Sequence, residues 1–305
     1  MKFNAINKFE PRDNKAYQSK MPTHSLLFAL MSRINKRSVD ETDANSVAIV
    51  GAGCGEIDML TIKAAQTIIS AQAIVYDNLV SKDILQLAAD DCEMHYMGKR
   101  FGEPSATQEQ INLKLLQLNQ QGKVVIRLKG GDPNVFGRGA EEALFLAQHG
   151  IKSEFIAGVT AALGCAASAG IPLTHRKVSR SVTFVTGHNC DDSAVEWSGL
   201  LASKSTLVFY MGKERAAFIA HGLLKAGAKL SLPVAFISNG GRTDQQVTTA
   251  TVKEMVEVAD SIKVDGPTLL IVGEVVAIGQ QLANCMSELD LGQMVNNLPL
   301  ECAYG

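Results

Sequence analysis

Short apolar runs that alternate with amphipathic segments are the feature that most constrains the fold of this chain. Val47–Val50 and Ala73–Tyr76 are continuous apolar runs, as expected for strands buried on both faces. Leu60–Ile69 and Thr107–Gln121 instead carry apolar residues at helical spacing. Strands that alternate with helices predict βαβ units and a mostly parallel sheet, so the expected fold class is α/β.

The same alternation continues along the chain. Further strands are predicted at 93–97, 124–128, 154–156, 182–186, 206–210, 233–238, 247–252 and 268–272. Further helices are predicted at 82–89, 141–149, 161–169, 216–226 and 253–259. Segment 245–252 is Thr-rich and alternates polar with apolar residues, which favours an antiparallel or edge strand.

Two α/β halves of similar size suit a chain of 305 residues. We expect an N-terminal α/β domain at 46–158, a C-terminal α/β domain at 159–284 and a C-terminal tail at 285–305. Residues 1–45 hold eight basic and five acidic residues and no sustained period. They are therefore expected to form a mobile extension outside the core.

Charge and cysteine usage argue against several classes of protein. Lysine plus arginine total 29 and aspartate plus glutamate total 31, and a net charge of −2 argues against a nucleic-acid binder. The six cysteines show no CxxC pair or zinc spacing, which predicts reduced thiols in a cytoplasmic protein without a metal. The apolar run at 25–31 is too short to span a membrane.

A glycine-rich loop, Gly51-Ala-Gly-Cys-Gly55, follows the first predicted strand, and Asp77 ends the second. Such a loop suits a nucleotide-binding βαβ unit, in which the acid binds a ribose hydroxyl. It suits a tight strand-to-helix turn equally well, because the spacing is GxGxG and not GxGxxG. The first reading makes an NAD-dependent oxidoreductase one hypothesis.

A second loop, Gly130-Gly-Asp132-Pro, lies at the carboxyl end of a predicted strand, where open α/β sheets bind ligands. Arg138 stands between two glycines without an evident local reason, whereas Glu141 and Glu142 favour the start of the next helix through its dipole. Lys99 and Arg100 lie in a glycine-flanked loop and could bind a carboxylate or a phosphate.

The histidines do not indicate hydrolase or zinc chemistry. His175 and His188 lie near no GxSxG motif, and the histidines show no metal-ligand spacing. A lone histidine is more often structural than catalytic.

Taken together, the motifs resemble the tetrapyrrole methylase family, and within it the enzymes that methylate uroporphyrinogen III. The resemblance spans residues 46–282 and rests on segments that occur in the family's order: 47–64, 76–80, 98–112, 125–142, 158–176, 183–188, 206–212 and 268–276. So many ordered motifs are far more specific than one glycine loop.

The resemblance implies S-adenosylmethionine-dependent methylation of uroporphyrinogen III at C2 and C7, giving precorrin-2 for sirohaem, cobalamin or haem d1. It also implies two α/β domains with the active site in the cleft between them, usually in a homodimer. The partner would be a small-molecule tetrapyrrole, and the cofactor would replace the dinucleotide of the first hypothesis. A precorrin methyltransferase of the cobalamin pathway and a non-catalytic tetrapyrrole binder are the alternatives.

Site residues follow from the resemblance position by position. Asp77 and Lys99 match the family's acid–base pair, and Arg100 is expected beside them. The cofactor contacts match Cys54, Gly130, Gly131, Asp132, Val135, Thr160, Ala161, Met211 and Gly240. Cys54 stands where the family usually has a proline, so the rigidity of that contact is lost.

The substrate carries many carboxylates, which arginine binds in bidentate fashion. Arg100, Glu103 and Arg138 are the expected substrate-binding residues. Lys99, Arg127 and Lys129 would add positive charge close by, so we expect a basic cleft that the near-zero net charge conceals.

Overall fold

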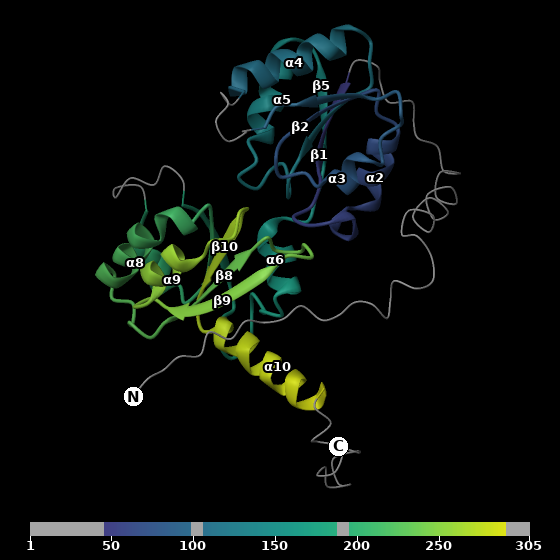
Figure 1. The fold of residues 1–305 in the computed structure, drawn as a ribbon. Coiled ribbons are helices and arrows are strands. Elements are labelled where there is room, and N and C mark those ends of the chain that lie inside the picture. Colours follow the sequence, from purple (N-terminus) through teal and green to yellow (C-terminus); the bar gives the residue numbers. More distant parts are fainter. Residues whose placement is uncertain (1–45, 99–105, 188–194, 291–305) are drawn as a thin grey trace. The chain divides into compact units, whose positions relative to one another are not determined.

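The structure is a computed structural model that describes residues 46–98, 106–187 and 195–290 (Figure 1). Among these residues the chain divides into two compact units. One comprises 46–164 and 241–245, and the other comprises 165–240 and 246–290. The division therefore falls a few residues after the expected boundary at 158, and a short later segment joins the first unit.

The first unit is built on a five-stranded parallel sheet with the order β3-β2-β4-β1-β5. Its strands are β1 (Ser46–Gly51), β2 (Ala73–Tyr76), β3 (Glu93–Tyr96), β4 (Val125–Lys129) and β5 (Lys152–Ile156). Its helices are α2 (Ile62–Ile69), α3 (Lys82–Leu85), α4 (Gln108–Gln120) and α5 (Gly139–Gln148), with a 3-10 turn at Ile57–Met59. The α/β prediction is confirmed here.

Helices cover both faces of this sheet (Figure 1). Ile126 and Leu128 of β4 pack in one apolar cluster with residues of α2 and α3. Val125 packs in a second cluster, with Leu115 of α4 and Leu146 of α5. Since successive residues of a strand point to opposite faces, the odd-numbered residues of β4 face α4 and α5.

Local signals explain several helix boundaries. Thr107 caps α4 through a reciprocal capping box with Gln110, and the predicted apolar face of Ile111, Leu115 and Leu118 is buried. Helix α3 ends at Leu85, four residues before its predicted end.

The second unit contains a mixed sheet with the order β6-β7-β10-β8-β9. Its strands are β6 (Val182–Thr186), β7 (Thr206–Tyr210), β8 (Pro233–Ser238), β9 (Gln246–Thr251) and β10 (Thr268–Val272). Only β6 and β7 pair in parallel; the other neighbouring pairs are antiparallel. The expectation of parallel pairing is wrong for this sheet, whereas β9 is an antiparallel edge strand as predicted.

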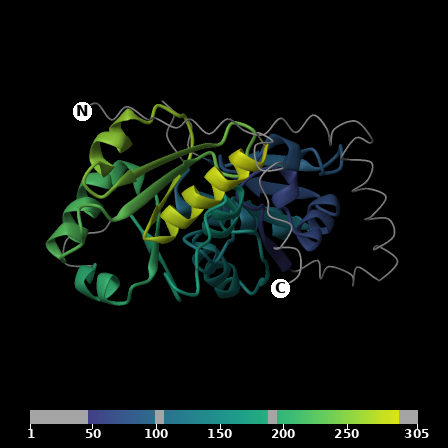
Figure 2. The same cartoon turned by 90° about the horizontal axis from the view of Figure 1, so that it is seen from below.

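The helices of the second unit are α7 (Trp197–Ala202), α8 (Ala216–Lys225), α9 (Met255–Ser261) and α10 (Val275–Asp290), with a 3-10 turn at Lys213–Arg215. Helix α6 (Ala161–Ser168) contains the boundary between the units. Helix α10, the long yellow helix of Figures 1 and 2, contacts β8 and β10 and runs past 285, where a tail was expected. None of the described helices has the length and apolar character needed to cross a membrane.

Candidate active site

The first unit collects most of the predicted site residues at one edge of its sheet. All five strands are parallel, so their carboxyl ends meet at the same edge, where open α/β sheets bind ligands. Asp77 follows β2 and Gly130–Asp132 follows β4. The glycine loop extends from the end of β1, and Gly158 lies two residues beyond β5. The sheet therefore brings together segments that are far apart in the chain, such as Gly51 and Gly158.

Three of these strand ends approach so closely that only glycine fits. A β-carbon on Gly51 would lie 2.6 Å from both the carbonyl oxygen of Gly131 and the amide nitrogen of Gly158. A β-carbon on Gly158 would strike the same carbonyl oxygen. Gly53 and Gly131 also exchange two backbone hydrogen bonds, of 3.1 and 2.6 Å. Glycine is needed here because backbone lies against backbone.

The glycine loop is not a dinucleotide-binding helix start. Helix α2 begins only at Ile62 and is capped by Thr61, while a 3-10 turn follows the loop. A β-carbon on Gly55 would strike the carbonyl oxygen of Gly241. Backbone packing therefore explains the loop glycines. Because α2 does not begin directly after the loop, its N-terminus is not placed to bind a phosphate there. The NAD hypothesis loses its structural basis.

The second glycine loop runs beside the start of α6 at the same edge. Gly131 has φ near +70°, a conformation that favours glycine. A β-carbon on Gly131 would lie 3.9 Å from the Cα atom of Thr160 and from the amide nitrogen of Ala161, which is an ordinary van der Waals distance. Three of the predicted cofactor residues therefore lie side by side. Backbone without a side chain, as at Gly131, is suited to close contact with a small ligand.

Asp132 ties two loops together. Its Oδ1 atom accepts a hydrogen bond from the amide of Asn134 at 2.8 Å, and Oδ2 accepts one from the amide of Gly158 at 3.1 Å. The first contact is the local turn bond that aspartate often makes. The second is made across 26 residues of sequence and holds the loop after β4 against the loop after β5. Asp132 thus shapes the backbone around Gly131.

Asp77 lies at the end of β2 beside a buried arginine. Its Oδ1 atom accepts from the amide of Leu79 at 3.1 Å, and Oδ2 lies 3.4 Å from Nη2 of Arg127. The carboxylate remains a quarter exposed, whereas Arg127 is 3% exposed. Asp77 is therefore an accessible carboxylate with a cation behind it, and its accessibility is what a proton acceptor needs.

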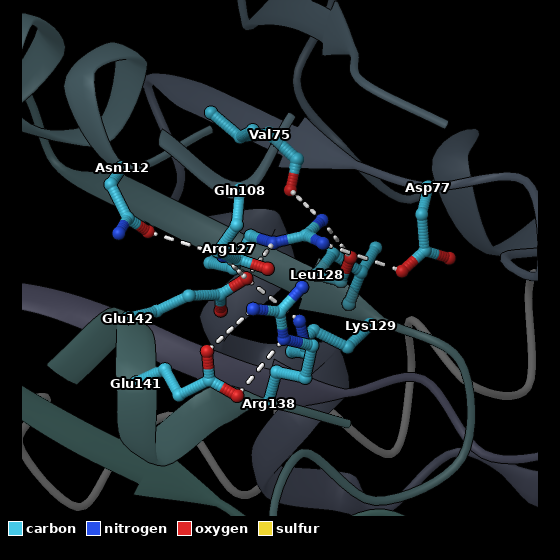
Figure 3. Close-up of polar contacts among 10 residues, drawn as sticks. All are labelled: Val75, Asp77, Gln108, Asn112, Arg127, Leu128, Lys129, Arg138, Glu141 and Glu142. Carbon is cyan, nitrogen blue, oxygen red and sulfur yellow. Dashed lines mark hydrogen bonds and ion pairs between the residues drawn. The ribbon is translucent and has the colours of Figure 1, made fainter. Parts of the chain in front are cut away.

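The structure corrects the predicted roles of Arg127 and Lys129 (Figure 3). Both residues are on the odd-numbered face of β4, so they turn toward α4 and α5 and are buried. Arg127 Nε and Lys129 Nζ bind the same oxygen of Glu142, at 3.1 and 2.8 Å. Burial, together with the charge of Arg127, lowers the pKa of Lys129. These two cations are paired inside the unit and do not line a basic cleft.

Arg138 has a local reason for its position that the sequence does not reveal. It is the left-handed residue before α5, with φ of 59°, and its Nε and Nη2 atoms hold Glu141 at 2.9 and 2.6 Å (Figure 3). The paired guanidinium lowers the pKa of Glu141. Both side chains are more than half exposed, so this bidentate pair is open to exchange with another carboxylate.

The other predicted residues are distributed as follows. Cys54 packs with its sulfur where a β-carbon of Gly164 would be, and Val135 donates its amide to the carbonyl of Asp132 at 3.3 Å. In the second unit, Met211 follows β7 with φ of 55°, and Gly240 follows β8. Lys99, Arg100 and Glu103 lie outside the described residues. Among the residues that the structure describes, no group of histidine, cysteine or acidic side chains could hold a metal.

Arg242 is a residue that sequence reasoning missed. It is half-buried in segment 241–245, and its Nη2 atom donates to the carbonyl of Leu79 at 3.3 Å. It forms no ion pair with the described residues, and its Nε atom is buried without a hydrogen-bond partner there. Leu79 lies two residues after Asp77 in the chain, so this contact brings the guanidinium of Arg242 to the turn that contains Asp77. The only local signal was an arginine two residues after the predicted cofactor residue Gly240.

Comparisons with known proteins identify the family of this chain. The family described as Tetrapyrrole (Corrin/Porphyrin) Methylases matches residues 46–256. A siroheme synthase from Pseudomonas fluorescens is 47% identical over 238 residues, which are 78% of this chain and 51% of that protein. The chain therefore spans about half the length of this relative.

Solved structures support the same relationship. Uroporphyrin-III C-methyl transferase from Thermus thermophilus, complexed with S-adenyl homocysteine, is 36% identical with a TM-score of 0.65. The match covers 76% of this chain and 99% of that one. A cobalt precorrin-4 methyltransferase is 22% identical with a TM-score of 0.69, covering 78% of this chain and 98% of that one. At that identity the likeness shows the fold alone.

Proposed function

This chain belongs to the tetrapyrrole methylase family and is a methyltransferase, and on that premise we propose that it methylates uroporphyrinogen III. The products would be precorrin-2 and S-adenosylhomocysteine, with methyl groups added at C2 and C7. The observation that carries the proposal is the match over 99% of the Thermus enzyme, at 36% identity. A later precorrin methyltransferase is the alternative, because the fold is common to both.

The glycine loop at Gly131 is the proposed site of the cofactor S-adenosylmethionine. The residues that would hold it from the first unit are Cys54, Gly130, Gly131, Asp132, Val135, Thr160 and Ala161; Met211 and Gly240 would hold it from the second. When bound, the cofactor supplies a methyl group on a positively charged sulfur. Backbone at Gly131 and Ala161 offers the close approach that a folded cofactor needs. That the site lies between the two domains stays a prediction.

Asp77 is proposed to handle the proton. The ring carbon that attacks the methyl group already carries a carboxylate side chain, so bond formation to the methyl group, with S-adenosylhomocysteine as the leaving group, leaves a positively charged ring. Loss of a proton from a ring nitrogen or from an adjacent bridging carbon neutralises that ring, and an accessible carboxylate can accept the proton. The remaining demand on the protein is alignment of the reacting groups, which lowers the barrier substantially. Lys99, the predicted partner of Asp77 in acid–base chemistry, stays a prediction, as does the role of Arg100 and Glu103 in binding substrate.

The proposed function is tested by turnover of uroporphyrinogen III with S-adenosylmethionine under reducing conditions. The expected product, oxidised after the reaction, shows the fluorescence of a dimethylated tetrapyrrole and a mass gain of two methyl groups. Product only from a precorrin substrate would favour the alternative. Binding without turnover of any tetrapyrrole would indicate a non-catalytic binder.

Arg138 and Glu141 should change substrate affinity in opposite directions. If a substrate carboxylate replaces Glu141 on Arg138, then Arg138→Ala should raise KM about tenfold, the loss of about one charge-assisted hydrogen bond. Glu141→Ala should lower KM, because it removes the competing carboxylate. Steady-state kinetics measure both, with S-adenosylhomocysteine affinity as the control. An unchanged KM and kcat in Arg138→Ala would refute the substrate role.

Arg242 is proposed as a further ligand for a substrate carboxylate. Its guanidinium lacks an acidic partner in the described part of the chain, so a polycarboxylate can supply one. We expect Arg242→Gln to raise KM for the tetrapyrrole about tenfold and to leave cofactor affinity unchanged. Arg180→Gln, at an exposed position in the second unit, is the matched control. Equal KM values for the two variants would remove Arg242 from the substrate site.

A further inference from the structure

Glu142 is a carboxylate that is completely buried, and the start of a helix does not require that. The first turn of α5 already contains Glu141 at the surface, which suffices for an interaction with the helix dipole. A carboxylate removed from water costs several kcal/mol unless it is paired and hydrogen-bonded. The burial of Glu142 therefore indicates that it orients the charged groups around it.

Three donors from two elements meet on one oxygen of Glu142 (Figure 3). Oε1 accepts from Arg127 Nε at 3.1 Å, from Lys129 Nζ at 2.8 Å and from Gln108 Nε2 at 3.1 Å. Gln108 is itself fixed through the side chain of Asn112, at 3.1 Å. Oε2 of Glu142 is buried without a hydrogen-bond partner among the described residues. Glu142 thus gathers two cations of β4 at one point.

Arg127 contacts both Glu142 and Asp77 and so links the two carboxylates. Its Nη1 atom donates to the carbonyls of Val75 and Leu128 at 3.2 and 3.1 Å, while Nη2 lies 3.4 Å from Asp77. The guanidinium is planar, so an anchor at Nε sets the direction of Nη2. Loss of the Glu142 anchor would leave Nε–H unpaired and would free the plane to tilt. The orientation of Asp77 therefore depends on a residue that it does not contact.

The charges of the cluster balance only when Asp77 is included. Arg127 and Lys129 contribute two positive charges and Glu142 one negative charge, so the buried part carries 2 − 1 = +1. Asp77 supplies the second negative charge, and it alone of the four is substantially exposed. Without Glu142 the buried part would carry +2, and Asp77 would be drawn toward it.

We propose that Glu142 is a positioning residue for Asp77, acting through Arg127 and balanced by Lys129. It holds the guanidinium plane and limits the positive charge behind Asp77, so that the carboxylate stays accessible and can accept the proton. The proposal rests on the proposed function, in which Asp77 accepts the proton. It assigns to the second glutamate of α5 a role in the reaction rate.

The test uses Glu142→Gln, whose amide oxygen can still accept from all three donors although the charge is lost. We expect kcat to fall about 10²-fold, as when a catalytic group is misplaced, with KM and S-adenosylhomocysteine affinity little changed. The decisive variant is Glu142→Gln combined with Lys129→Met, since it removes one charge of each sign. We expect the double variant to recover most of the lost kcat.

A residue with only a packing role gives the opposite pattern, because a second buried substitution then lowers kcat further. That result, or a Glu142→Gln variant with the kcat of the wild type, overturns the proposal. If Glu142→Gln alone fails to fold, recovery of folding and turnover in the double variant supports the proposal. If neither variant folds, Glu142 is required for stability, and the proposal is overturned.

A structural readout separates this proposal from the proposed function. A crystal structure of Glu142→Gln should show the Arg127 Nε hydrogen bond kept but Asp77 drawn closer to Arg127, whichever tetrapyrrole the enzyme uses. Absence of turnover by the wild type with uroporphyrinogen III would count against the proposed function alone. Wild-type turnover with an unchanged Arg127–Asp77 contact in the variant would count against Glu142 alone.

Discussion

Replacement of Asp77 by asparagine should lower kcat by about 10²–10⁴-fold, the usual contribution of a general base. The amide oxygen can still accept the hydrogen bond of the Leu79 amide, so the turn after β2 is expected to persist. The amide nitrogen cannot accept a proton, and beside Arg127 it places two donors against each other. The reaction should therefore lose its proton acceptor while the fold remains.

Single-turnover and steady-state kinetics with uroporphyrinogen III measure the effect of Asp77→Asn. Affinity for S-adenosylhomocysteine, measured by calorimetry, should stay at the wild-type value, because Asp77 is not among the proposed cofactor contacts. Asp83→Asn is the matched control, an exposed aspartate at the start of α3 in the same unit. A wild-type kcat in Asp77→Asn would show that another group accepts the proton.

Replacement of Asp132 by alanine is expected to weaken cofactor binding strongly. Both oxygens of Asp132 accept backbone hydrogen bonds, and the bond from Gly158 holds the loops after β4 and β5 together. Loss of two charge-assisted hydrogen bonds, about 3 kcal/mol, corresponds to a loss of about 10²-fold or more in affinity. The loop at Gly131 would lose its shape even though Asp132→Ala adds no bulk.

Asp132→Asn refines this prediction. An amide has one acceptor oxygen, so only one of the two backbone amides keeps its partner, and we expect a smaller loss of affinity than in Asp132→Ala. Calorimetry with S-adenosylhomocysteine measures both variants, and the exposed Asp90→Ala serves as the control. Normal affinity in Asp132→Ala would refute the role of Asp132 in the cofactor loop.

Much of the fold could be predicted from the sequence, because its signals are local. The apolar runs of β1 and β2 and the capping box of α4 depend only on residues that are close together in the chain. The mixed pairing of the second sheet could not be predicted in the same way. Strand direction there depends on which strands become neighbours, and Leu270 of β10 pairs with Phe209 of β7 from far along the chain.

For the site, too, local patterns could be read from the sequence, whereas contacts between distant residues could not. Gly130, Gly131 and Asp132 could be chosen as candidates because a strand end followed by two glycines and an aspartate is a local pattern. Arg127 and Lys129 were wrongly expected to line a basic cleft. Their charge was evident, but the identity of their partner was not, since Glu142 reaches them from another element.

The sequence by itself thus determined the α/β class, the family and the loops at the strand ends, because periodicity and turn chemistry act over a few residues. Only the tertiary structure decided what each charge does. It turned Arg127 and Lys129 inward onto Glu142, left Asp77 accessible with a cation behind it, and brought Arg242 to the carbonyl of Leu79. A buried charge takes the partner that packing brings within reach, and sequence spacing does not specify that partner.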